Sequence, residues 1–250
     1  MPDAAASGAD PIRGHVYAVG IGPGAPDLLT LRAVQVIRGA DVIICPRSSK
    51  SEKSMALETI RPWINGQELI EAVYPMRRDQ KATSAFWRQM AEEAALRAEK
   101  GCVVAQITLG DPLLFSTSCY FLAEVQTLMS RGKVHVVPGI AAFQAVSARL
   151  KKALAVQEDR LLLMTGTETE QIKRALQECE TLVLYKAGQN MQHIRRLLEE
   201  EGLLADSALV CYAEQKKEFV CRDLREYSGC LPGYLACVVI HVRRREWQKD

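Results

Sequence analysis

The sequence alternates short apolar runs with longer stretches of helical period from residue 15 onward. Runs such as 15–21 (HVYAVGI) and 102–109 (CVVAQITL) are short, rich in β-branched residues and bounded by glycine, which is typical of buried strands. The charged, alanine-rich stretch 79–100 has the length and composition of a helix. A chain that repeats strand and helix in this way is expected to fold as an α/β protein with largely parallel sheets.

The expected elements form two sets, each large enough for a domain of ordinary size. We expect a disordered leader at 1–13, an N-terminal α/β domain at 14–120 and a C-terminal α/β domain at 121–250. Thr30 is the expected N-cap of the first helix. The expected strands are 15–21, 42–45, 69–73, 102–109, 133–137, 161–165, 181–185, 207–212, 218–221 and 234–242, and the expected helices are 30–38, 52–60, 79–100, 115–129, 140–150, 168–179 and 190–201.

The two sheets should differ in strand direction. Strand and helix alternate throughout the first set, which predicts a mostly parallel N-terminal sheet. The strands 207–212 and 218–221 are joined by a short turn, which predicts a hairpin and therefore a mixed C-terminal sheet with the strand 133–137 opening its set.

Composition excludes several classes of protein. A formal net charge of +2 does not favour a nucleic-acid partner. No run approaches the ~20 apolar residues of a membrane span, and the leader has no apolar core, so we expect a soluble cytoplasmic chain. The eight cysteines form no CxxC pair and read as reduced thiols, and the four histidines are isolated, so no metal site is expected.

Three glycine-containing segments follow expected strands, at 20–25 (GIGPGA), 109–112 (LGDP) and 137–142 (VPGIAA). Ligands of open α/β sheets bind at the carboxyl ends of strands, where these segments fall. Each segment taken alone is equally consistent with a simple connecting turn. In the second segment, Asp111 offers a carboxylate that accepts hydrogen bonds from a ligand amine or hydroxyl.

The first segment also matches the GxGxxG/A pattern of dinucleotide-binding loops. A dinucleotide site needs a carboxylate at the end of the second strand to hold the ribose. That strand runs instead into Cys45-Pro46-Arg47, while Asp41 precedes it, and Pro23 and Pro26 delay the helix. A nucleotide-binding oxidoreductase therefore remains an alternative that this pattern does not favour.

The order and content of the three segments resemble the tetrapyrrole methylase family along nearly the whole chain. The matching residues are Gly20-x-Gly22-Pro23-Gly24 with 29–33 (LTLRA), then Gly110-Asp111-Pro112, then 137–140 (VPGI). Within that family, the segments 44–48 (ICPRS), 74–79 (YPMRRD), 108–117 (TLGDPLLFST) and 143–145 (FQA) are similar to those of the precorrin-2/cobalt-factor II C(20)-methyltransferases.

The resemblance implies a two-lobed α/β homodimer with a ligand cleft between the lobes. It implies S-adenosyl-L-methionine as cofactor and methylation of carbon 20 of precorrin-2 or cobalt-factor II, in cobalamin biosynthesis. Where the uroporphyrinogen-methylating branch carries an aspartate, this chain has Pro46, which disfavours that earlier step. By position, the implied cofactor-binding residues are Pro23, Gly110, Asp111, Leu114, Ser116, Thr117, Ala141, Ala142, Tyr185, Lys186, Ala213 and Ala236. Many relatives have methionine in place of Lys186.

A substrate with eight carboxylates should be met by cations, and guanidinium groups suit carboxylate geometry. The candidates are Arg47, Lys50, Arg77 and Arg78. The residue that takes the proton released by methylation is not indicated, and Tyr120, Tyr185 and Tyr212 are equivalent candidates.

Two further alternatives stay open from the sequence. One is a methyltransferase of the same pathway that acts at another ring carbon. The other is a non-catalytic α/β module that senses S-adenosyl-L-methionine.

Overall fold

A computed structural model describes residues 10–48, 54–74, 80–229, 233 and 235–243. Contacts within it divide the chain into two compact units, with the division after Ala141 rather than after residue 120. The later division follows from the strand Val134–Val137, which belongs to the first sheet. We describe each unit by itself.

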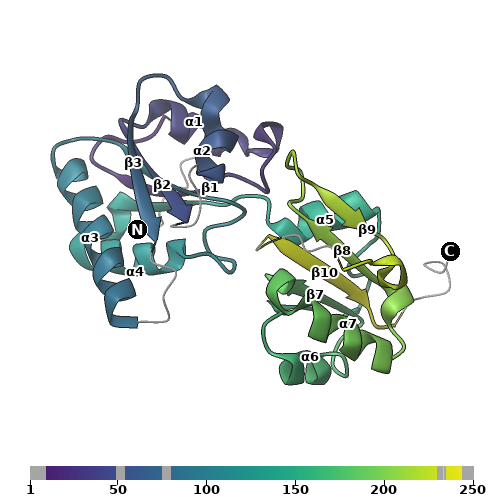
Figure 1. The fold of residues 1–250 in the computed structure, drawn as a ribbon. Coiled ribbons are helices and arrows are strands. Elements are labelled where there is room, and N and C mark those ends of the chain that lie inside the picture. Colours follow the sequence, from purple (N-terminus) through teal and green to yellow (C-terminus); the bar gives the residue numbers. More distant parts are fainter. Residues whose placement is uncertain (1–9, 49–53, 75–79, 230–232, 234, 244–250) are drawn as a thin grey trace. The chain divides into compact units, whose positions relative to one another are not determined.

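The N-terminal unit contains a five-stranded, wholly parallel sheet (Figure 1). The strand order is β3-β2-β4-β1-β5, which confirms the predicted parallel arrangement. The expectation that the strand 133–137 opens the second sheet is wrong, because Val134 lies opposite Val16 of β1 in parallel register. The strands are β1 (Val16–Gly20), β2 (Val42–Ser48), β3 (Glu68–Tyr74), β4 (Val104–Thr108) and β5 (Val134–Val137).

Helices cover both faces of this sheet, and each face has its own apolar core. On one face, α1 and α2 pack on Tyr17, Val19 and Ile107. On the other face, α3 and α4 pack on Val16 and Val104. These alternating side chains explain why the strands read as continuous apolar runs. The helices are α1 (Leu31–Gly39), α2 (Met55–Ile60), α3 (Gln80–Glu99) and α4 (Ser118–Leu128).

Thr30 caps α1 as the sequence predicts. Its Oγ1 accepts a hydrogen bond from the Ala33 amide at 3.2 Å, which satisfies one of the amides left open in the first turn. Short 3-10 helices lie in the connections of both units: η1 (Pro26–Leu28), η2 (Arg61–Trp63), η3 (Arg131–Lys133), η4 (Ala187–Asn190), η5 (Leu204–Asp206) and η6 (Leu224–Glu226).

The C-terminal unit contains a mixed five-stranded sheet in the order β6-β7-β10-β8-β9. β6 and β7 are parallel, while β10 is antiparallel to both β7 and β8. β8 and β9 form the predicted hairpin. The elements are α5 (Ala142–Leu150), β6 (Leu161–Thr165), α6 (Thr169–Ala175), β7 (Thr181–Tyr185), α7 (Met191–Glu200), β8 (Ser207–Cys211), β9 (Phe219–Cys221) and β10 (Ala236–His241).

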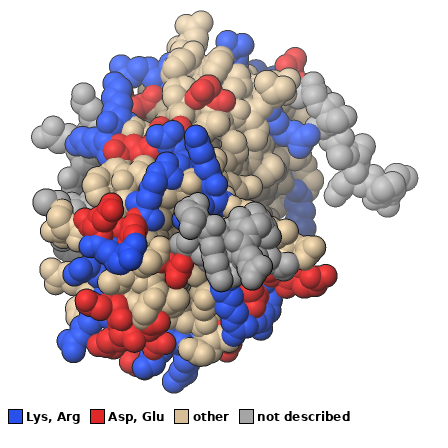
Figure 2. Space-filling view, turned by 90° about the vertical axis from the view of Figure 1, so that its right-hand side faces the viewer, with Lys and Arg blue, Asp and Glu red and all other residues tan. Residues whose placement is uncertain are grey.

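Charged side chains of both signs are interleaved on the face of the molecule shown in Figure 2. The described residues include ion pairs between an exposed arginine and a half-buried glutamate, such as Arg149 with Glu218 at 2.6 Å and Arg160 with Glu180 at 3.0 Å. Pairs of this kind contribute little to stability, because water screens them. In the described residues, none of the helices has the length and apolar content needed to cross a bilayer.

The described cysteines, seven in number, are free thiols. Burial raises the pKa of the Cys45, Cys211 and Cys237 thiols to about 12. These three sulfurs therefore stay protonated at neutral pH and do not act as nucleophiles, because the thiolate is the reactive form.

Two histidines meet near the start of β1 and β5. His15 Nδ1 lies 2.8 Å from His135 Nε2, so one of the two rings donates a hydrogen bond to the other. Burial, with a smaller contribution from the charge of Lys133, lowers the pKa of His15 below its usual 6.5. The unfolded chain therefore binds more protons than the folded chain just below pH 6.5.

We expect the free energy of unfolding to be highest above about pH 6.5 and to fall as the pH is lowered towards 5. Thermal unfolding measured from pH 7.5 to 5 checks this. A His15→Gln chain, which does not titrate at this position, should show a shallower decline. An equal decline in both chains would mean that other groups control the pH dependence.

Candidate functional site

The carboxyl ends of β1 and β4 form a topological switch point, where two neighbouring strands lead into helices on opposite faces of the sheet. The two strands are neighbours and run parallel. β1 leads into α1 on one face, whereas β4 leads into α4 on the opposite face. Such switch points are the usual ligand sites of open α/β sheets.

The loops that leave β1 and β4 are joined by backbone hydrogen bonds. Gly22 and Gly110 form an antiparallel bridge in which the Gly110 amide donates to the Gly22 carbonyl at 2.7 Å. Both glycines have a positive φ, of 74° and 73°, in the region where L side chains are strained. The bridge places Pro23, which is buried, directly beside the loop that follows β4.

The third loop closes on the same point through glycine. A Cβ at Gly139 would lie 2.2 Å from the Gly110 carbonyl oxygen and 2.7 Å from the Gly20 carbonyl carbon. A Cβ at Gly20 would meet the Gly139 amide nitrogen at 2.6 Å. Glycine is therefore needed because three backbones touch here. The three segments therefore share one edge of the first sheet, although the sequence pattern placed the strand before the third segment in the second sheet.

Asp111 links the second loop to the third. One carboxylate oxygen accepts from the Leu113 amide at 2.8 Å, and the other accepts from the Gly139 amide at 3.1 Å. In this structure the Asp111 carboxylate therefore holds the second and third loops together. Each oxygen can accept a second hydrogen bond, so Asp111 keeps capacity for a ligand.

The rest of the second loop turns sharply before α4. Phe115 has a φ of 49°, an uncommon value for an aromatic residue. Leu114 and Ser116 are half-buried, and Thr117 is exposed. Ser116 Oγ lies 3.0 Å from Thr108 Oγ1 and accepts from the Ser118 amide at 3.1 Å.

The third loop supplies two small residues. A Cβ at Gly110 would be 4.0 Å from the Ala141 Cα, so the two residues are neighbours, and Ala141 is buried. Ala142 is the first residue of α5, in the C-terminal unit. Of the residues predicted in the N-terminal unit, Pro23, Gly110, Asp111, Leu114, Ser116, Thr117 and Ala141 thus lie on the connected loops.

The four remaining predicted positions lie along one edge of the second sheet. Tyr185 ends β7 opposite Cys237, and Ala236 begins β10 opposite Cys211 of β8. Lys186 directly follows β7, and Ala213 is the second residue after the end of β8. The structure therefore brings these positions to the carboxyl ends of β7 and β8.

The backbone at this edge is strained. Lys186, Tyr212 and Glu214 have positive φ values of 55°, 51° and 61°. Such conformations cost energy in non-glycine residues and cluster at functional sites. The Tyr185 hydroxyl accepts a hydrogen bond from the Phe143 amide at 3.1 Å, which holds α5 to the end of β7. No sequence pattern signals these strained residues.

Only one of the four predicted substrate-binding cations lies in a described part of the chain. Arg47 Nε lies 2.7 Å from the Glu71 carboxylate, across β2 and β3. Its charge is therefore partly balanced in the isolated chain. Lys50, Arg77 and Arg78 lie outside the described residues.

The three tyrosine candidates for the released proton differ in their surroundings. Tyr120 is 59% exposed, and its ring lies 6.0 Å from that of Trp87. Tyr185 and Tyr212 are half-buried at the edge of the second sheet. The geometry does not single out one of them.

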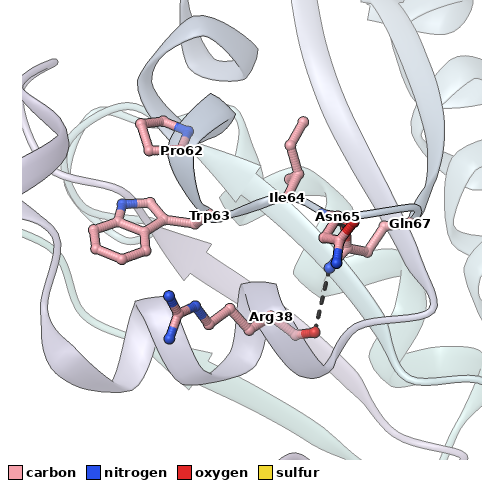
Figure 3. Close-up of a pocket in the computed structure, with 6 residues that line it drawn as sticks. All are labelled: Arg38, Pro62, Trp63, Ile64, Asn65 and Gln67. Carbon is pink, nitrogen blue, oxygen red and sulfur yellow. Dashed lines mark hydrogen bonds between the residues drawn. The ribbon is translucent and has the colours of Figure 1, made fainter.

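A pocket of about 370 Å³ lies elsewhere in the N-terminal unit (Figure 3). The Arg38 guanidinium covers the Trp63 ring at 5.1 Å, and Gln67 Nε2 donates to the Arg38 carbonyl at 3.2 Å. These residues end α1 and precede β3, so the pocket is at the amino ends of the strands. It is separate from the three loops.

One buried polar side chain, that of Gln106, was not identified from the sequence. Gln106 is 1% exposed in the middle of β4, and its Oε1 accepts from the Ser118 hydroxyl at 2.8 Å. A glutamine within the otherwise apolar run 102–109 is the signal that points to it, since buried amides need partners.

Together, the fold and the loops define an α/β protein whose candidate ligand site is built from backbone turns at a sheet switch point. Comparison with known proteins is more specific. The model of the family described as Tetrapyrrole (Corrin/Porphyrin) Methylases matches residues 15–224. The chain belongs to this family.

Two relatives carry the name of one activity. The chain is 34% identical over 160 residues to the cobalt-precorrin-2 C(20)-methyltransferase of Salmonella typhimurium, covering 64% of this chain and 66% of that protein. It is 36% identical over 150 residues to a probable cobalt-precorrin-2 C(20)-methyltransferase of Methanocaldococcus jannaschii, covering 60% and 63%. The matched segments thus span slightly less than two thirds of either relative.

A solved structure shows the same fold. It is the uroporphyrin-III C-methyl transferase of Thermus thermophilus complexed with S-adenosyl homocysteine. The TM-score is 0.61 at 22% identity, over 91% of this chain and 98% of that chain. The predicted tetrapyrrole methylase fold is therefore confirmed.

Proposed function

We propose that the protein transfers a methyl group from S-adenosyl-L-methionine to carbon 20 of precorrin-2 or cobalt-factor II, in cobalamin biosynthesis. The observation that carries the proposal is the meeting of Gly20, Gly110 and Gly139 at the switch point, in a chain of the tetrapyrrole methylase family. The names of the two relatives support the choice of carbon 20.

The residues at the three loops fit this cofactor. Asp111 offers carboxylate acceptors for amino or ribose groups, and Ser116 offers a hydroxyl. Gly110 and Ala141 present backbone and small side chains, which allow close approach of a flat ligand. When bound, the cofactor supplies the reactive methyl on a sulfonium centre, and the loops orient it.

We assign the cofactor-binding positions of the second unit in the same way. Tyr185, Lys186, Ala213 and Ala236 form one edge of the second sheet, and we propose that they line the adenosine pocket. We propose Arg47, with Lys50, Arg77 and Arg78, as partners of the substrate carboxylates. A homodimer is part of the same proposal.

The nucleotide-binding oxidoreductase is less well supported. In dinucleotide-binding folds the helix starts in the glycine loop, so its amino end faces the pyrophosphate. Here η1 follows the glycines and α1 begins only at Leu31, after the Thr30 cap. Methylation at another ring carbon is the stronger alternative, because the solved structures with this fold include a uroporphyrin-III C-methyl transferase.

Methyl transfer from labelled S-adenosyl-L-methionine tests the proposal. We expect label at carbon 20, located by NMR, when precorrin-2 or cobalt-factor II is supplied without oxygen. Uroporphyrinogen III serves as the substrate control and should stay unlabelled. Label at a different carbon would replace the assigned position, and cofactor binding without transfer to any tetrapyrrole would contradict the enzymatic function.

A further inference from the structure

A buried polar network lies beneath the second loop, between β4 and the start of α4. Gln106 Nε2 donates to the Ile107 carbonyl at 2.9 Å, and Gln106 Oε1 accepts from the Ser118 hydroxyl at 2.8 Å. The Ser118 amide donates in turn to Ser116 Oγ, which lies 3.0 Å from Thr108 Oγ1. The segment Ser116–Ser118 is thus anchored to the strand at both ends.

Burial makes the network costly unless its groups are satisfied. Gln106 is 1% exposed, Ser118 0% and Thr108 8%, whereas Ser116 is half-buried in the loop. A buried polar group without a partner destabilises the fold by more than a hydrogen bond normally contributes. An apolar residue in place of Gln106 would pack against Ser118 without needing hydrogen-bond partners. The presence of a polar network here therefore indicates that the segment Ser116–Ser118 has to be held in one conformation.

The number of hydroxyl hydrogens indicates which of the two hydroxyl groups, that of Thr108 or that of Ser116, donates the hydrogen bond between them. The Thr108 and Ser116 hydroxyls have two hydrogens, and one of these lies between the two oxygens. If Ser116 donated, the hydrogen of the Thr108 hydroxyl, on a side chain that is 8% exposed, would be left without an acceptor among the described residues. The lower-cost arrangement has Thr108 donating to Ser116.

In that arrangement Ser116 Oγ accepts two hydrogen bonds, from Thr108 and from the Ser118 amide. Both lone pairs of the oxygen are then used. Its own hydrogen is directed away from the strand, to the loop side of the network. Ser116 is therefore set to donate to a ligand rather than to accept from one.

We propose that Gln106, Thr108 and Ser118 are positioning residues that hold the Ser116 hydroxyl as a hydrogen-bond donor to an oxygen acceptor of the bound cofactor. The inference rests on the proposed function, because it takes S-adenosyl-L-methionine as the ligand of this loop. The oxygen atoms of this cofactor belong to its carboxylate and its ribose, so the acceptor is one of these two groups.

A double-mutant cycle on cofactor affinity tests the proposal. Thr108→Val keeps the shape of the side chain but removes the hydroxyl, so Ser116 becomes free to donate its hydrogen elsewhere or to rotate. We expect Thr108→Val and Ser116→Ala each to raise the Kd for S-adenosyl-L-methionine by about tenfold. In the Ser116→Ala chain, Thr108→Val should add almost nothing, because Thr108 acts through Ser116. Thr108→Ser restores the hydroxyl and should restore the affinity.

Thr181→Val is the matched control, since Thr181 is a buried strand threonine in the second sheet. It should leave the Kd unchanged, and thermal unfolding of every variant separates affinity from stability. If the unmodified chain binds cofactor and Thr108→Val does not change the Kd, or if the two effects simply add, the network is structural only and the inference is wrong. If the unmodified chain does not bind S-adenosyl-L-methionine, the proposed function fails and the inference fails with it. Methyl transfer to a carbon other than carbon 20 overturns only the proposed specificity, whereas cofactor binding without transfer to any tetrapyrrole overturns the proposed enzymatic function and leaves the inference about Ser116 standing.

Discussion

Gly139→Ala is expected to abolish cofactor binding and to destabilise the N-terminal unit. The new methyl carbon would lie 2.2 Å from the Gly110 carbonyl oxygen, which is far inside van der Waals contact. Neither neighbour can yield like a side chain, because both Gly110 and Gly20 contribute backbone atoms. We expect a loss of roughly 3 kcal/mol or more in the free energy of unfolding.

The two ends of β5 provide a matched pair of variants for this prediction. Gly132 precedes the strand, and a Cβ there meets nothing within 4 Å. Gly132→Ala should change the stability by less than about 0.5 kcal/mol and leave the affinity for S-adenosyl-L-methionine intact. Denaturant unfolding and calorimetric titration of both chains make the comparison. Equal behaviour of the two variants would show that the three backbones do not need to touch.

Asp111→Asn is expected to have the second-largest effect. The carboxylate accepts from the Leu113 and Gly139 amides at its two oxygens. An amide group can accept at only one of these positions and places an N–H against an N–H at the other. We expect a loss of about 1–3 kcal/mol in the free energy of unfolding and a rise in the Kd for S-adenosyl-L-methionine of at least about tenfold.

Asp41→Asn separates these two effects. Asp41 Oδ2 accepts from the Val103 amide at 2.8 Å, a bond of the same kind at the opposite ends of the strands. The Asp41→Asn chain should therefore lose stability but keep its affinity for the cofactor. If Asp111→Asn also kept its affinity, the link between the second and third loops would have no part in binding.

Much of the fold is readable from residue patterns. The strands pack on both faces, so runs such as 102–109 stand out as apolar. The Thr30 cap was predictable because a threonine before an apolar-periodic run is a known helix start. The expected start of α4 at residue 115 was early, since the left-handed Phe115 keeps the chain in a loop until Ser118. The identity of an aromatic residue such as Phe115 gives no sequence signal that its backbone will adopt a positive φ.

The candidate site was predictable in part. Glycine at the ends of strands marked the loops, and the family resemblance pointed to Asp111 and Ser116. That Asp111 joins two loops depends on the approach of Gly139 across the sheet, which local patterns do not contain. The same holds for the Thr108 hydroxyl, whose partner is fixed by the turn at Phe115.

The position of β5 has a consequence for synthesis of the chain. Val16 pairs with Val134, and the strands between them in sequence lie on the other side of β1. On the ribosome, one edge of β1 stays unpaired until β5 has emerged, and exposed edges invite pairing with other chains. A nascent chain halted at residue 120 would therefore expose the unpaired edge of β1. Folding of this unit depends on a strand translated after all its other strands, which exposes it to chaperone capture during translation.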